Sequence, residues 1–266
     1  MTDRPAHALL LEPLVALARA AGREVMQVYA SDFVVEGKAD DSPVTLADRR
    51  AEAVILAGLS RLAPELPVVA EEAASAGDVP AVGRRFWLVD PLDGTREFVH
   101  RNGEFTVNIA LVEDGQPTLG VVWAPAVGRM FAGLSPPDGR AQAFEIDDQG
   151  RRAIRVRPVP AEGLTVLASR SHGDAQALGQ WIEAQRTGGR PVARVMASGS
   201  SLKLCRIAAG EGDAYPRFGR TMEWDIAAGH AVLAAAGGRV LGLDGGPLAY
   251  GKPGHENASF VAWGGA

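Results

Sequence analysis

The sequence predicts two stacked lobes, an α+β lobe followed by an α/β lobe, covering residues 1–157 and 158–266. Three patterns support this division. Two amphipathic helical stretches come first, a texture typical of an antiparallel β meander begins at Phe105, and strands alternate with helices beyond Pro158. A chain of 266 residues is long enough for one large domain or for two lobes that share a core.

The first lobe opens with two predicted helices. Apolar residues recur every three or four positions from Leu11 to Tyr29, which is the stripe of a long amphipathic helix. A second stripe runs from Leu46 to Leu62, and Pro64 and Pro67 end it.

Short apolar runs bounded by turn residues predict the strands of this lobe. The runs at 68–70 and 86–89 each lead directly into acidic residues. The strands of the meander are expected at 106–112, 118–122 and 130–132, with turns at 113–117 and 147–150.

The second lobe is predicted from alternating elements. Its strands are expected at 165–168, 192–196, 213–215, 239–241 and 259–261, and its helices at 174–185, 200–209 and 225–236. Such alternation is typical of an α/β lobe.

Composition excludes several classes of protein. A net charge of −5 gives no nucleic-acid footprint. A single cysteine, Cys205, excludes a disulfide within the chain, favours a reducing compartment and is interpreted as a packing thiol. No signal peptide and no run of about 18 apolar residues occur, so we expect a soluble, cytoplasmic protein without a transmembrane segment.

The segment Asp90-Pro91-Leu92-Asp93-Gly94-Thr95 carries the main chemical pattern. Two carboxylates follow a strand, Gly94 permits close backbone approach, and Thr95 can cap a short helix that begins at Arg96. Carboxylates beside a helix N-terminus provide a cation site and an anion site together, which a phosphate ester with Mg²⁺ would satisfy. An ordinary acidic turn with a helix cap explains the same residues nearly as well.

Other acidic residues favour the cation site without deciding the matter singly. Glu71 and Glu72 follow the strand at 68–70, so neighbouring strands would bring both acid pairs together. Asp225 opens an apolar helix, where it could cap the helix, bind a metal or do both. Asp48 lies three residues after Thr45, which is typical of a capping box.

The remaining motifs are informative by their absence. The histidines lack the spacing of zinc sites and there is no cysteine cluster, so oxygen ligands favour Mg²⁺. The sequence has no phosphate-binding P-loop, no dinucleotide-binding glycine motif after a strand and no serine nucleophile elbow.

With these residues in place, the chain resembles the inositol monophosphatase superfamily. Residues 87–95 look like its first signature, residues 223–229 look like its second, and Glu71-Glu72 resembles its acid pair. The resemblance runs from about Glu36 to Trp263. It implies a layered α-β-α-β-α sandwich of the inositol monophosphatase and fructose-1,6-bisphosphatase type.

Three stretches, 38–48, 96–111 and 213–217, resemble one branch, the bacterial 3′(2′),5′-bisphosphate nucleotidases. These enzymes remove the 3′-phosphate of adenosine 3′,5′-bisphosphate, giving AMP, and help to recycle by-products of sulfate assimilation. Ala70 departs from the pattern, since serine or glycine often precedes the acid pair. The alternatives are a phosphatase for inositol phosphate, histidinol phosphate or a sugar phosphate, and a non-catalytic nucleotide-binding protein.

The resemblance also implies residue roles in a two-metal activation of water. Glu71, Asp90 and the Leu92 carbonyl would hold one Mg²⁺, and Asp90, Asp93 and Asp225 a second, with two or three Mg²⁺ per site. Glu71 and Thr95, the latter oriented by Asp48, would act in catalysis. The substrate contacts implied in this way are Glu71, Asp93, Gly94, Thr95, Arg96, Gly199, Ser200, Ser201, Lys203 and Asp225.

Further properties follow from the same resemblance. Lithium inhibition is expected, the protein would be a monomer or a homodimer, and some relatives are peripheral to the inner membrane. Because clustered carboxylates repel one another, we also expect the metal-free site to be partly disordered and Mg²⁺ to raise the thermal stability.

Overall fold

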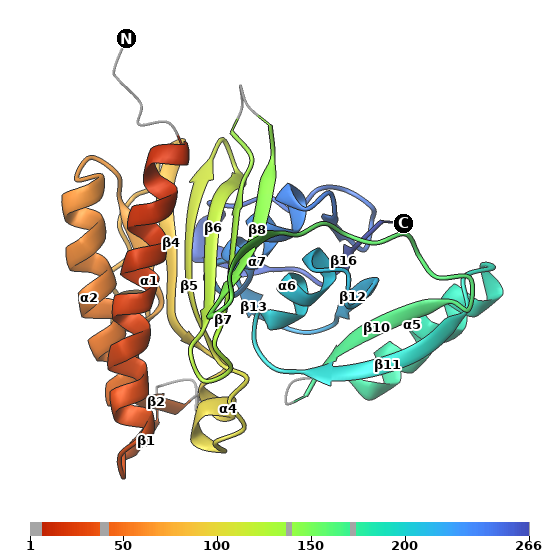
Figure 1. Cartoon of the computed structure of the whole chain (residues 1–266), viewed down its shortest axis with the longest axis horizontal. Coiled ribbons are helices and arrows are strands. Elements are labelled where there is room, and N and C mark those ends of the chain that lie inside the picture. Colours follow the sequence, from red (N-terminus) through yellow and green to blue (C-terminus); the bar gives the residue numbers. More distant parts are fainter. Residues whose placement is uncertain (1–6, 38–42, 137–139, 171–173, 266) are drawn as a thin grey trace.

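Five layers of alternating helices and sheets make up the protein, seen edge-on in the computed structural model (Figure 1). The structure describes residues 7–37, 43–136, 140–170 and 174–265. Within the stretch 38–48 that resembles the nucleotidase branch, Lys38 to Ser42 lie outside the described residues. The layered sandwich implied by the resemblance is confirmed.

The first layer is the pair of N-terminal helices, α1 (His7–Tyr29) and α2 (Leu46–Leu62). Leu14, Ala18 and Val25 of the predicted stripe are fully buried against the adjacent sheet. The predicted bounds of the second helix are confirmed to the residue. It starts there because Thr45 accepts a hydrogen bond from the Ala47 amide.

The second layer is a seven-stranded sheet in the order β3-β4-β5-β6-β7-β8-β9. Its strands are β3 (Val68–Ala70), β4 (Arg85–Asp93), β5 (Thr106–Glu113), β6 (Gln116–Ala124), β7 (Arg129–Leu134), β8 (Gln142–Asp147) and β9 (Gly150–Ala153). Strand β3 pairs parallel to β4, and every later pairing is antiparallel, which confirms the meander. The predicted turn at 147–150 joins β8 to β9, two strands that the sequence did not reveal.

The third layer consists of α6 (Leu202–Ala208) and α7 (Glu223–Ala235), which lie between the two sheets. Helix α7 is almost wholly apolar and packs closely on the seven-stranded sheet. Its approach requires glycine on two strands. A Cβ added at Gly120 would lie 2.8 Å from the Ala231 Cβ, and one added at Gly133 would lie 2.5 Å from the Val232 Cα.

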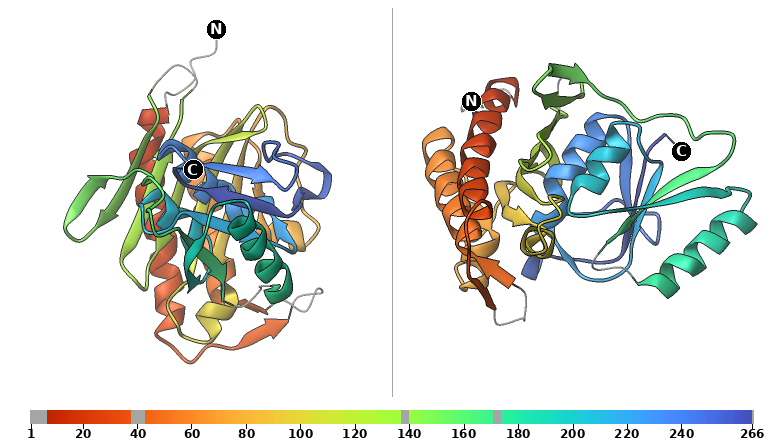
Figure 2. Two further views of the ribbon diagram at one scale, coloured as in Figure 1. Left: turned by 90° about the vertical axis from the view of Figure 1, so that its right-hand side faces the viewer. Right: turned by 60° about the horizontal axis from the view of Figure 1, so that its bottom comes forward.

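The fourth and fifth layers are a mixed five-stranded sheet and the outer helix α5 (Ala175–Thr187), which the right-hand view of Figure 2 shows on the side away from α1 and α2. The strand order is β11 (Val192–Ser198), β10 (Leu164–Ser169), β12 (Ala214–Arg217), β16 (Phe260–Trp263) and β14 (Arg239–Gly242). Leu178 and Trp181 of α5 pack on its outer face. The lobe boundary at residue 157 stays a prediction.

The short elements are where sequence and structure differ most. They are β1 (Val35–Gly37), β2 (Pro43–Thr45), α3 (Glu71–Ser75), α4 (Thr95–Val99), β13 (Thr221–Met222), η1 (Pro253–His255) and β15 (Glu256–Asn257). Of these, only α4 was predicted, and its predicted cap was wrong. Gly94, with φ of 88°, occupies the cap position, so the helix begins at Thr95. In the described ranges, no helix has the length and apolar character needed to cross a membrane.

The close approach of α7 can be tested by a pair of substitutions. Gly133→Ala should destabilise the protein by about 1–3 kcal/mol, because the new methyl group overlaps the α7 backbone. Gly179→Ala is the control, since this glycine lies in α5 with open space around it, and it should stabilise by up to about 1 kcal/mol. Urea denaturation measures both, and equal effects would contradict this packing.

A buried ion cluster at the end of β5 ties α1 to the sheet and predicts an acid sensitivity. Although burial opposes it, hydrogen bonds from His7 (2.5 Å) and Thr118 (2.7 Å) lower the Glu113 pKa to about 2. The stabilisation is therefore complete above the ordinary pKa of 4.5 and is lost as the pH falls towards 2. Glu113→Gln should cost roughly 1.5–3 kcal/mol at pH 7. Its deficit should vanish at acid pH, and a pH-independent deficit in the melting temperature would contradict this.

Candidate active site

Two neighbouring strands deliver the first acids to one place. Val69 pairs with Leu88 and Ala70 with Val89, so Glu71 emerges beside Asp90 at the same edge of the sheet. The expectation that these strands are neighbours is confirmed.

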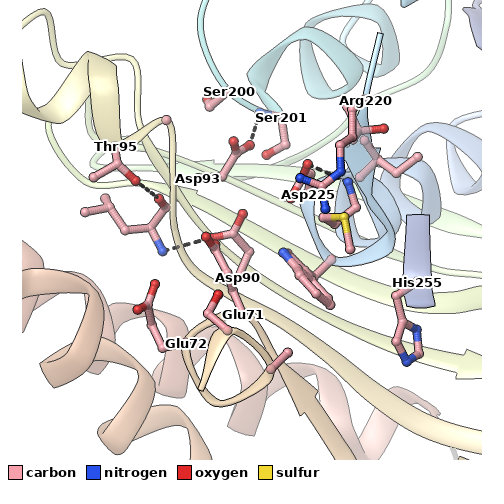
Figure 3. A pocket seen from close by; sticks show the side chains of 18 of the residues that line it. Glu71, Glu72, Asp90, Asp93, Thr95, Ser200, Ser201, Arg220, Asp225 and His255 are labelled. Carbon is pink, nitrogen blue, oxygen red and sulfur yellow. Dashed lines mark hydrogen bonds between the residues drawn. The ribbon is translucent and has the colours of Figure 1, made fainter. Parts of the chain in front are cut away.

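Asp93, at the end of β4, and Asp225, at the start of α7, complete the group of carboxylates. All four line a cleft of about 1110 Å³. Figure 3 shows Asp90 at its centre, between Glu71, Asp93 and Asp225.

Burial and mutual repulsion disfavour charge on the three aspartates of this group. Asp90 is 1 % exposed, and burial together with Glu71, Asp93 and Asp225 raises its pKa well above 3.8. Burial and the carboxylates of Asp93 and Glu71 likewise raise the pKa of Asp225. Burial raises the pKa of Asp93 to about 6, although Lys203 and the Ser201 amide act in the opposite direction. A bound cation would reverse this balance.

The donor set fits a hard divalent cation, because it consists of carboxylate oxygens and the Leu92 carbonyl without thiol or imidazole. Among the described residues, no three His, Cys, Asp or Glu side chains are arranged closely enough to hold an ion. Three carboxylates instead accept backbone amides: Asp90 from Leu92 (3.0 Å), Asp93 from Ser201 (2.5 Å) and Asp225 from Met222 (2.8 Å). Each of these bonds uses one carboxylate oxygen, and each carboxylate has a second oxygen.

Asp225 differs from its expected local position. The capping interpretation placed it at the N-cap of its helix, but α7 begins at Glu223 and the N-cap is Met222. Asp225 therefore lies in the first turn and accepts the Met222 amide from inside the helix. This bond holds the carboxylate at the helix end that faces Asp90.

The turn after Asp93 brings Gly94, Thr95 and Arg96 to the cleft wall. The first intrahelical bond of α4 runs from the Phe98 amide to the Gly94 carbonyl, at 2.9 Å. The amides before Phe98 consequently have no acceptor within the helix. The family resemblance implies that the amides from Asp93 to Arg96 bind phosphate oxygens, and this stays a prediction.

Asp48 lies behind the cleft and does not line it. Its Oδ2 accepts the Thr45 amide (2.7 Å) and hydroxyl (2.8 Å), which confirms the capping box. The other oxygen, Oδ1, is buried without a hydrogen-bond partner, and burial raises the Asp48 pKa to about 7.

Thr95 does not bond to Asp48 in this structure. Its hydroxyl donates to the Leu92 carbonyl at 3.2 Å. The orientation of Thr95 by Asp48 therefore stays a prediction, and the unsatisfied Asp48 Oδ1 is the atom free to make that bond.

Some of the residues at 199–203, which are expected to contact the substrate, instead make hydrogen bonds within the protein. Ser200, Ser201 and Lys203 line the cleft, whereas Gly199 does not and donates its amide to the Glu104 carboxylate at 2.8 Å. The Ser201 hydroxyl is engaged by Asn108 and Thr106, each at 2.9 Å.

The Lys203 amine also makes hydrogen bonds within the protein. It donates to the carbonyls of Ser198 (3.3 Å) and Ser200 (2.5 Å), and burial lowers its pKa to about 8. Ser200 also lines the cleft, and its hydroxyl accepts the Leu202 amide at 3.4 Å. Any contact between these residues and a substrate stays a prediction.

Sequence reasoning missed several residues of the cleft. Arg217, Arg220, Trp224 and His255 line it, and the Glu223 carboxylate accepts a 2.7 Å hydrogen bond from His255 Nδ1. Arg217 and Trp224 lie in the stretches 213–217 and 223–229 that resemble the family, but the resemblance assigns neither of them a role in the site. His255 comes from the far end of the chain, and no sequence pattern marked it.

Comparisons with known proteins show which family the sequence matches. A profile of the inositol monophosphatase family matches residues 8–263. The 3′(2′),5′-bisphosphate nucleotidase CysQ of Escherichia coli strain K12 is 47 % identical over 243 residues, which are 91 % of this chain and 94 % of that protein. The protein of the same name from Aggregatibacter actinomycetemcomitans is 31 % identical over 257 residues, 95 % of this chain and 91 % of its own.

Solved structures show the same fold. CysQ from Bacteroides thetaiotaomicron, a bacterial member of the inositol monophosphatase family, superposes with a TM-score of 0.76 at 31 % identity, covering 96 % of this chain and 97 % of that one. The inositol monophosphatase of Thermotoga maritima superposes with a TM-score of 0.74 at 28 % identity, covering 94 % and 90 %.

The repulsion at Asp90 predicts an unusual effect on stability. Asp90→Asn should raise the melting temperature of the metal-free protein, because it removes a charge that burial and three carboxylates disfavour, and each kcal/mol gained is worth about 2–4 °C. Since the folded-state pKa is raised, the difference from wild type should grow as the pH rises above 3.8. Thermal denaturation with a chelator measures it. The exposed Asp148→Asn is the control, and a lower melting temperature for Asp90→Asn would contradict the electrostatic argument.

Proposed function

This chain belongs to the inositol monophosphatase family and is a phosphatase, and we propose that it hydrolyses the 3′-phosphate of adenosine 3′,5′-bisphosphate to give AMP and phosphate. The relatives named 3′(2′),5′-bisphosphate nucleotidase support this substrate, since they match over nearly the whole chain.

The observation that carries the proposal is the composition of the cleft. Glu71, Asp90, Asp93 and Asp225 form an acidic centre, and Arg217 and Arg220 line the wall contributed by the second half of the chain. A substrate with two phosphates would present one to the acidic centre with its cations and the other to guanidinium groups. A volume of about 1110 Å³ leaves room for a nucleoside between them.

We propose Mg²⁺, two or three ions per site, as the cofactor. Glu71, Asp90, Asp93, Asp225 and the Leu92 carbonyl would hold it. When bound, Mg²⁺ neutralises the charge on the phosphoryl oxygens and stabilises the departing 3′-oxygen.

The protein's own groups would handle water and its proton. Thr95 lies at the cleft wall beside the Leu92 carbonyl and would orient the attacking water. Asp48, whose burial raises its pKa to about 7, would take up the proton, because a base with this pKa suits catalysis near neutral pH. The bond between phosphorus and the 3′-oxygen breaks as the water oxygen bonds to phosphorus, and the 3′-oxygen takes a proton from solvent water to become the 3′-hydroxyl of AMP.

A phosphatase for inositol phosphate, histidinol phosphate or a sugar phosphate is the alternative within the family. A substrate with a single phosphate would leave Arg217 and Arg220 without an anionic partner from the ligand, so the cleft favours the bisphosphate. The expected monomer or homodimer, lithium inhibition, role in sulfur assimilation and cytoplasmic location stay predictions.

Steady-state rates test the proposed substrate. With Mg²⁺, kcat/KM for adenosine 3′,5′-bisphosphate should exceed that for inositol 1-phosphate by at least about 10²-fold, because a site built for a second phosphate discriminates strongly against ligands lacking it. Chelation should abolish turnover and Mg²⁺ should restore it. Asp90→Asn is the inactive control. A faster rate on inositol 1-phosphate would transfer the proposal to the alternative.

A further inference from the structure

The helix that presents Glu71 lacks a cap of its own. Helix α3 has five residues and begins at Glu71, and its N-cap residue, Ala70, has no side-chain oxygen. The first amides of a helix have no acceptor within it, and Ser, Thr, Asp or Asn at the N-cap normally accepts those of the second and third residues.

A carboxylate from another helix occupies that role. Glu52 of α2 accepts the Glu72 amide through Oε2 at 2.8 Å and the Ala73 amide through Oε1 at 3.0 Å. These are the second and third residues of α3, the same donors that a serine at position 70 would satisfy. Glu52 is 6 % exposed, so solvent offers those amides little alternative.

The two bonds determine where the Glu71 backbone lies. On one side, Ala70 is held by its parallel pairing with Val89, one residue before Asp90. On the other, Glu52 holds the next two amides against α2. Glu71 is therefore fixed from both directions at the level of Asp90, although α3 buries none of its own side chains fully.

This arrangement is electrostatically costly. Burial, with the neighbouring carboxylates of Glu72 and Glu71, raises the Glu52 pKa to about 7, although the hydrogen bonds from the two amides act in the opposite direction. A hydroxyl at position 70 would cap α3 without placing a further acid beside Glu71.

We propose that Glu52 is a positioning residue for the cation site, acting through α3 by capping it from α2 and so setting the place of the Glu71 carboxylate. This inference rests on the proposed role of Glu71 as a Mg²⁺ ligand. Groups that orient metal ligands typically change metal affinity by roughly 10–100-fold when they are removed.

The test separates positioning from simple stabilisation by measuring Mg²⁺ affinity without substrate. The melting temperature is recorded across a Mg²⁺ titration for wild type, Glu52→Gln, Glu52→Ala and the double variant Glu52→Ala with Ala70→Ser. Glutamine keeps the shape of the side chain but places an NH₂ donor opposite one of the two amides. This variant therefore tests the proposal even where the alanine variant folds poorly.

Glu113→Gln is the matched control. Glu113 is 7 % exposed, is hydrogen bonded like Glu52 and does not line the cleft. It should lower the melting temperature without Mg²⁺ and leave the half-saturating Mg²⁺ concentration unchanged.

The expected result is a rise of about tenfold or more in half-saturating Mg²⁺ for both Glu52 variants, with most of it reversed by Ala70→Ser. Activity should follow the same shift, with kcat returning towards wild type at saturating Mg²⁺. A half-saturation within about twofold of wild type for Glu52→Gln would overturn the proposal, as would a folded double variant that Ala70→Ser does not rescue. A wild-type melting temperature insensitive to Mg²⁺ would instead remove the proposed function, which the first titration reveals before any variant is made.

Discussion

Repulsion among buried carboxylates is the constraint on which the rest of this structure depends. Asp90 is almost completely buried with Glu71, Asp93 and Asp225 around it, an arrangement that raises the pKa values of Asp90, Asp93 and Asp225. Backbone amides offset part of that cost, since Leu92, Ser201 and Met222 each donate to one of these carboxylates. Asp90, Asp93 and Asp225 are each turned towards an amide, and a bound cation would offset the remaining repulsion among the four carboxylates.

The layered arrangement brings these acids to one edge of the seven-stranded sheet. Parallel pairing of β3 with β4 sets Glu71 beside Asp90, which a hairpin could not do, because antiparallel strands end at opposite edges. Asp225 comes from the second half of the chain and reaches the edge only because α7 lies deep against the sheet. Gly120 and Gly133 create that depth. Residues far from the chemistry thus determine the distance between two ligands.

Sequence patterns predicted the long elements and the acids, because hydrophobic periodicity and strand-end positions are local properties. Local patterns did not decide the five-layer fold or the cation ligands. Both were predicted from the resemblance to a known family. Errors gathered at caps, where the outcome depends on one backbone angle: the positive φ of Gly94 moved the start of α4 by one residue, and Met222 took the cap position expected for Asp225. The roles of Gly199 and Ser201 could not be read from sequence, since their partners, Glu104, Asn108 and Thr106, are about 95 residues away. His255 and Arg220 reach the cleft through tertiary packing, for which the sequence offers no local sign.

Helix α2 shows how such long-range placement is still encoded locally. Asp48 and Glu52 are four residues apart, so they share one face of the helix, and both are buried in spite of their charge. Asp48 caps its own helix through the Thr45 amide, and Glu52 caps α3 through the amides of Glu72 and Ala73. Two acids one turn apart on an otherwise apolar face are unfavourable for folding unless amides meet them. In this fold the pair marks the helix face that supports the Glu71 backbone, and its burial, which the sequence alone does not reveal, distinguishes it from an ordinary pair of surface acids.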